Sequence, residues 1–135
     1  MRSMSLLIAG GLLASCSMGP PTPPIPPTAE GMHQYDLLLA GKVAQRPVSC
    51  LPTYSSNDMV RLDPQTLGFR VGGGTSYVVH LGPGCEALMN PTATLVSHQP
   101  GGSGLCTHDI ERVIDTSGFP IGSCSIEEVV PYVRR

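Results

Sequence analysis

Proline most restricts where this chain can fold, because residues 17–28 (SMGPPTPPIPPT) hold six prolines. Each proline fixes φ and lacks an N–H donor, so neither a helix nor a sheet can include this run. We expect a polyproline II spacer, rising about 3.1 Å per residue, rather than a docking site for a proline-binding domain. A folded domain must therefore lie after the run, in residues 29–135.

The first fifteen residues have the three parts of a bacterial export signal. Arg2 gives a positive head, residues 5–13 form an uncharged, largely apolar run, and Ala14 and Ser15 are small. The apolar run is too short to cross a bilayer, which needs about 20 apolar residues. Residues 1–15 are therefore predicted to be a cleaved signal peptide.

The residues at the predicted cut, Leu13-Ala14-Ser15-Cys16, resemble the lipobox of bacterial lipoproteins. The resemblance implies that diacylglycerol alkylates the Cys16 thiol, that the chain is cut before Cys16 and that the new amine is acylated. A thiolate is the nucleophile that this chemistry needs, and several acyl chains make a stable membrane anchor. Ser17 implies sorting to the outer membrane rather than the inner one. The expected location is the cell envelope, facing the periplasm.

Residues 29–135 suffice for one small domain. The whole chain has a formal charge of −2, and the local basic cluster in the sequence is Arg134-Arg135, so nucleic acid is not an expected partner. The chain has no Trp, two Phe and four Tyr, which disfavours aromatic platforms that stack bases or sugars. So few large side chains predict a thin core that depends on disulfides.

Four cysteines remain once Cys16 is assigned to lipid: Cys50, Cys85, Cys106 and Cys124. An even number in an oxidising compartment predicts two disulfides, for which three connectivities exist. We favour the nested arrangement, Cys50–Cys124 and Cys85–Cys106, in which the first bridge would tie the ends of the strand region. In the loop-closure account, each bridge stabilises the fold by roughly 3–4 kcal/mol.

Metal binding and catalysis are the alternative uses of these cysteines. No spacing is C-x2-C, and the histidines are His33, His80, His98 and His108. Possible ligands or a nucleophile with its base come together in the sequence at residues 106–109 (CTHD). We predict crosslinking instead, and therefore no metal, no cofactor and no catalytic residue. A second hypothesis places His80 with Arg61 and Arg70 on a polar sheet face that could bind an anion, against the simpler reading of a solvated face.

Residues 29–39 (AEGMHQYDLLL) are predicted to form one short helix. Met32, Tyr35, Leu38 and Leu39 would share one face, with Thr28 as N-cap and Gly41 as the stop.

From Pro47 onward the pattern predicts strands. Alternating apolar residues mark strands near residues 60–62, 67–71 and 77–81, separated by turns at 63–66 and 72–74. Together they predict a three-stranded meander with one apolar face. Further strands are expected near 95–98, 110–115 and 123–132, and Pro131 predicts that the last is an edge strand or extended tail. The fold class is mainly β: a small antiparallel sheet, sandwich or partly open barrel.

The cysteine contexts resemble a family of small four-cysteine exported proteins and lipoproteins of proteobacteria, a domain of unknown function. The similarity covers Cys50 to Pro131 and includes the segments Gly84-Cys85-Glu86-Ala87-Leu88, Leu105-Cys106-Thr107-His108-Asp109 and Gly122-Ser123-Cys124-Ser125-Ile126. This chain departs from the family at Glu86, where Pro is usual, and at Val129, where Phe is usual. The resemblance implies four paired cysteines and no known activity, so it assigns no catalytic residue.

The sequence therefore predicts a lipid-anchored, disulfide-bonded domain that acts as a noncatalytic structural or binding accessory of the envelope, with another envelope protein as a possible partner. The first rival is a periplasmic metal- or small-ligand-binding module that uses His80, His98, His108 or Asp109. The second is a minor envelope enzyme, which would require a concave pocket with converging polar groups.

Overall fold

The computed structural model describes residues 28–52, 58–97 and 104–135, so Cys16, His98, the predicted signal and the predicted spacer up to residue 27 lie outside the described residues. The elements in chain order are α1 (Ala29–Leu39), β1 (Lys42–Ala44), β2 (Cys50–Leu51), β3 (Met59–Asp63), β4 (Thr66–Val71), β5 (Thr75–Leu81), the 3-10 helix η2 (Glu86–Met89), β6 (Thr94–Val96), β7 (Leu105–Cys106), β8 (Ile110–Ile114) and β9 (Pro120–Arg134).

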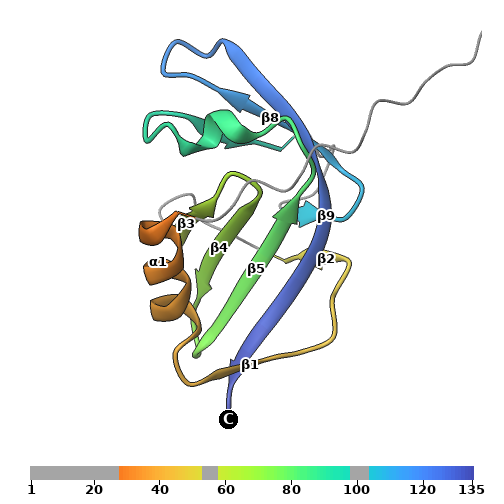
Figure 1. Cartoon of the computed structure of the whole chain (residues 1–135). Coiled ribbons are helices and arrows are strands. Elements are labelled where there is room, and N and C mark those ends of the chain that lie inside the picture. The colour runs from red at the N-terminus through yellow and green to blue at the C-terminus, as the bar shows by residue number, and fades with distance from the viewer. Residues whose placement is uncertain (1–27, 53–57, 98–103) are drawn as a thin grey trace, which may run out of the picture.

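The strands form an antiparallel half-barrel, which confirms the predicted mainly β fold class. The order of the large sheet is β3-β4-β5-β9-β8-β6, with β1 added beside the far end of β9, and β2 pairs with β7 in a separate small sheet. The strand β9 runs the length of the molecule, pairing with β8 at one end and with β5 and β1 at the other (Figure 1). One strand thus belongs to both halves of the sheet.

The helix α1 spans the predicted residues and begins as predicted. The Thr28 hydroxyl accepts a hydrogen bond from the Gly31 N–H at 3.0 Å, and Gly41 follows the C-cap with φ 69°, a conformation that glycine adopts at little cost. The helix rests on β3 and β4 (Figure 1), where an ideal Cβ at Gly31 would lie 1.6 Å from the Leu62 carbonyl oxygen. Glycine is therefore what lets the helix approach the sheet.

The predicted meander β3-β4-β5 is confirmed, but it has two buried faces instead of one. Leu67, Phe69 and Val79 contribute to the main core on the concave side. On the other side, Leu62 and Val78 pack against Leu38 of α1. The helix therefore covers the apolar side of β3 together with the sides of β4 and β5 that alternation marks as polar.

The prediction that Pro131 lies in an edge strand or tail is wrong, because β9 is central and Pro131 is buried. In an antiparallel ladder, the N–H and C=O of one residue point to the same neighbour. The Pro131 carbonyl accepts a hydrogen bond from the Gln45 N–H at 2.8 Å, so the missing proline donor also faces Gln45, just beyond the end of β1. The ladder with β5 therefore loses no hydrogen bond.

The main core fills the concave side of the half-barrel. Its buried members come from the sheet, from η2 and from the small β2–β7 sheet: Leu51, Leu67, Phe69, Val79, Leu81, Cys85, Leu88, Ala93, Leu95, Leu105, Val113, Cys124, Ile126 and Val129. Arg61 reaches from β3 to the segment before β6, donating from a guanidinium nitrogen to the Ala93 carbonyl at 2.8 Å. This bond links the two outer edges of the half-barrel.

Candidate functional surfaces

All four predicted cysteines form disulfides, but the nested connectivity is wrong. The structure joins Cys50 to Cys106 and Cys85 to Cys124, so the two bridges interlace along the chain. Pairing of β2 with β7 places Cys50 opposite Cys106, while Cys85 lies beside β9 near Cys124. The sheet topology, which the spacing of cysteines does not reveal, determines the connectivity.

Cys106 does not supply the metal ligand or nucleophile considered for residues 106–109, because its sulfur is in a disulfide. The Cys106 sulfur is bonded to Cys50, and the exposed His108 adopts φ 72° in the turn before β8, where its N–H donates to the Ile126 carbonyl. The Asp109 carboxylate accepts a hydrogen bond from the Cys106 N–H at 3.1 Å. Among the described residues, no group of three or more His, Cys, Asp or Glu side chains could hold a metal ion.

The predicted polar face of His80, Arg61 and Arg70 does not form as a unit. Arg61 pairs with Leu67, which pairs with Val79, so Arg61 lies on the opposite sheet face from His80. The prediction failed because β3 turns its apolar residues toward α1, whereas β4 turns Leu67 into the main core. His80 and Arg70 do share a face, which also carries Ser76.

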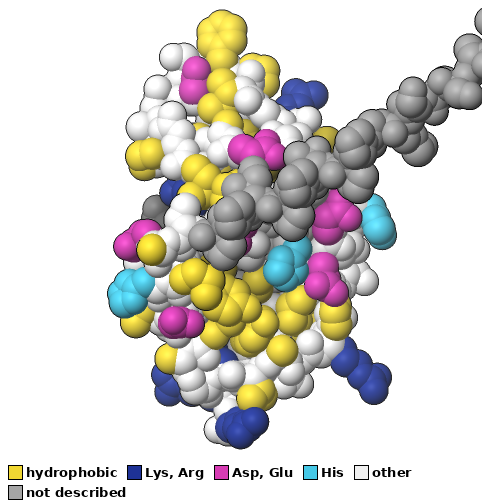
Figure 2. Space-filling model, viewed as in Figure 1, with side chains coloured by type: hydrophobic (Ala, Val, Ile, Leu, Met, Phe, Trp, Pro, Cys, Tyr) yellow, Lys and Arg dark blue, Asp and Glu magenta, His cyan; other side chains and the backbone are white. Residues whose placement is uncertain are grey.

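The hairpin of β8 and β9 exposes three large apolar side chains. The exposed fractions are 63% for Ile110, 68% for Phe119 and 42% for Ile121. The inner side of the hairpin is occupied by Val113 and Cys124 in the core, so Ile121 and the alternating outward residues face away from it. The hairpin projects from the end of the molecule opposite β1 (Figure 1), and hydrophobic atoms are visible at that end in Figure 2.

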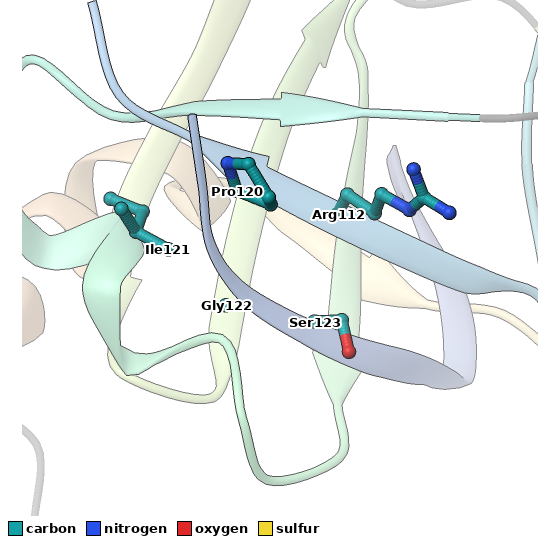
Figure 3. Close-up of a pocket in the computed structure, with 5 residues that line it drawn as sticks. All are labelled: Arg112, Pro120, Ile121, Gly122 and Ser123. Atoms are coloured by element: carbon teal, nitrogen blue, oxygen red, sulfur yellow. The ribbon is translucent and has the colours of Figure 1, made fainter. Parts of the chain in front are cut away.

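An open depression of about 590 Å³ lies on the hairpin, lined by Arg112 from β8 and by Pro120, Ile121, Gly122 and Ser123 from β9. In Figure 3, Arg112 and Ile121 extend in opposite directions from it. A guanidinium, a hydroxyl and apolar carbons thus border one accessible surface. This combination suits contact with a protein surface that is partly apolar and partly polar.

Glu111 is the buried charged residue that the sequence analysis did not single out. It lies on β8 opposite Cys124, its side chain is fully buried, and neither carboxylate oxygen has a hydrogen-bond partner among the described residues. Burial raises the pKa of Glu111; the nearby Ser97 hydroxyl opposes this rise, and the charge of Asp109 adds to it. Ser97 itself donates to the Gly104 carbonyl at 3.4 Å and makes no hydrogen bond to Glu111.

Lys42 binds the C-terminal end of α1. Its ammonium donates to the Leu38 carbonyl at 2.7 Å and to the Ser76 hydroxyl at 2.6 Å. A cation at this position complements the negative end of the helix dipole. Burial lowers the pKa of Lys42, and the charges of Arg134 and Arg70 lower it further. The strand register places Arg134 opposite Lys42 and Arg70 opposite Ser76, which Lys42 contacts, so cations from separate strands meet here.

Comparison with known proteins finds no match: neither a protein family, nor a curated protein, nor a solved structure is significantly similar to this chain. Within the described ranges, no helix combines the length and apolar character needed to span a membrane.

Proposed function

We propose that this chain is a lipid-anchored cell-envelope protein and a noncatalytic accessory that binds another envelope component through the outer face of the β8–β9 hairpin. The same proposal includes lipidation at Cys16 and membership of the four-cysteine family. It also places the domain on the outer rather than the inner membrane, facing the periplasm. Two interlaced disulfides support it, because such bridges persist in oxidising compartments.

The observation that carries the binding role is the exposure of Ile110, Phe119 and Ile121 on one hairpin. Exposing apolar carbon to water costs about 25 cal/mol per Å², so covering these side chains with a partner is favourable. Neighbouring polar groups, Arg112 and Ser123, can add hydrogen bonds at the rim. Neither the exposure nor the rim is needed to complete the core.

The anchor is tested by the intact mass of the protein extracted from membranes. We expect a mature chain that begins at Cys16, carries diacylglycerol and a further acyl group, and lacks the four hydrogens that two disulfides remove. The Cys16→Ser variant should accumulate as an uncleaved precursor. Recovery of the native protein with an unmodified Cys16 would contradict the proposal.

The binding surface is tested by photo-crosslinking in cells, with the photoreactive residue at Phe119 and, as a control, at the exposed His33 on α1. We expect one defined partner to crosslink from position 119 and none from position 33. Adding Ile121→Ser should abolish the crosslink without changing the thermal unfolding of the domain. Equal crosslinking from both positions would show that the hairpin has no special role.

A further inference from the structure

The end of the half-barrel opposite the hairpin gathers cations that are far apart in the sequence. Lys42 pairs with Arg134 between β1 and β9, and Arg70 pairs with Ser76, which pairs in turn with Tyr132 of β9. Residues 42, 70 and 134 therefore lie on neighbouring strands at one end and on the face that carries α1. The terminal Arg135 follows directly.

The side chains confirm this proximity. The Cδ of Arg134 would lie 3.2 Å from a Cβ built on Gly74, so the arginine lies over the turn between β4 and β5. The Lys42 ammonium contacts the Ser76 hydroxyl, and Ser76 is the register partner of Arg70. On the face shown in Figure 2, Lys and Arg side chains lie mainly at this end, whereas Asp and Glu lie above it.

Among the described residues, the guanidinium groups at this end have no hydrogen-bond or ion-pair partner. Arg70, Arg134 and Arg135 are exposed, and none forms an ion pair or hydrogen bond with another described residue. Lys42 donates to the helix end and to Ser76, so it stabilises the fold and also adds positive charge to this end. An uncompensated group of arginines at one end of a protein with net charge −2 favours an external anion.

We propose that this basic end, defined as Lys42, Arg70, Arg134 and Arg135, docks on the phosphate groups of an anionic lipid surface. The choice of a membrane rests on the proposed function, since an anchor at Cys16 keeps lipid phosphates close to the domain. Basic residues near an anionic bilayer each strengthen binding about fivefold.

The predicted spacer is long enough for this orientation. The twelve residues 17–28, which follow Cys16, would reach about 37 Å in polyproline II, and the 11-residue helix α1 is about 17 Å long. The spacer joins α1 at Thr28, and the basic end lies at the other end of this helix, beside Leu38. A docked basic end would turn the β8–β9 hairpin away from the lipid, where it can meet its partner.

Vesicle sedimentation tests the proposal with the mature chain carrying Cys16→Ser, exported behind a conventional signal and therefore free of lipid. We expect binding to an equal mixture of phosphatidylglycerol and phosphatidylcholine, and none to phosphatidylcholine alone. Arg134→Gln and Arg70→Gln should each weaken binding about fivefold, and together about 25-fold. Circular dichroism and thermal unfolding verify that each variant is folded.

The matched control is Arg112→Gln, which removes the same charge from the hairpin. It should leave binding unchanged, because the hairpin would lie well beyond the screening length of about 8 Å from the docked surface. An equal loss from Arg112→Gln, or equal binding to both kinds of vesicle, would overturn the proposal. Loss of vesicle binding when phosphate replaces chloride at equal ionic strength would also overturn the proposal, because it would assign the site to free phosphate. Because no acyl chain is present, these results are independent of the Cys16 mass measurement.

Discussion

The carboxyl group of Glu111 should make the stability of this domain fall as the pH rises. Its side chain is fully buried and its oxygens lack partners in the described chain, so the folded state favours the neutral acid. Because burial raises the pKa of Glu111 in the folded state, this state holds its proton more tightly than the unfolded chain. The stabilising effect is complete below the unfolded-state pKa of about 4.3 and is lost as the pH rises through the folded-state pKa.

The size of the effect follows from the same geometry. Between the two pKa values, Glu111 should lower the free energy of unfolding by up to about 1.4 kcal/mol per pH unit. A buried polar group without a partner costs about 1–3 kcal/mol, and more when charged. Glu111→Leu should therefore gain at least about 1 kcal/mol at neutral pH, which for a domain of this size raises Tm by about 4–8 °C.

The assay is urea unfolding of the oxidised protein at several pH values from about 5 to about 8, for the wild type and Glu111→Gln. The amide cannot ionise, so the stability of the variant relative to wild type should rise with pH. Glu128→Gln, the same change at an exposed position of β9, serves as the control and should run parallel to wild type. If Glu111→Gln also ran parallel to wild type, the proposed burial of a neutral acid would be refuted.

Three further expectations concern packing, crosslinks and a phenol. Gly31→Ala should destabilise the domain by about 1–3 kcal/mol in urea unfolding, since its Cβ would strike a backbone oxygen, whereas Gly72→Ala, with nothing within 4 Å of its Cβ, should be close to neutral. Replacing Cys85 and Cys124 together by Ala should lower the free energy of unfolding by about 4 kcal/mol, the loop-closure value. In the wild type, peptide mapping without reductant should recover these two cysteines in one linked pair. Ultraviolet titration should find the phenol of Tyr35 ionising near its raised pKa of about 12, chiefly because it is buried and also because another tyrosine hydroxyl lies 3.3 Å away; a pKa near 10 would contradict this packing.

Local signals in the sequence predict the local structure well. The Thr28 cap and Gly41 stop define α1, and the turn at 63–66 forms with the Asp63 carboxylate accepting from the Gln65 N–H at 2.8 Å. These features depend on contacts between residues a few positions apart. Propensity and spacing therefore suffice to predict them.

Features that depend on distant contacts were missed. Val78 and Ser76 are fully buried, although alternation places them on the side away from the main core, because a helix from the other end of the chain covers them. The cysteine pairing follows from which strands neighbour each other. The basic end likewise needs the register of β1 with β9, which brings Lys42 to Arg134 across 92 positions of sequence.

The central place of β9 has a consequence for how this protein is made. The fifteen residues of β9, Pro120–Arg134, pair with β1, β5 and β8, so the sheet cannot be assembled from the preceding residues alone. A chain that emerges with its N-terminus first therefore lacks its central strand until residues 120–134 have been made. Until then, β3-β4-β5 and β6-β8 can form only separate pieces of sheet, which β9 joins in one late step.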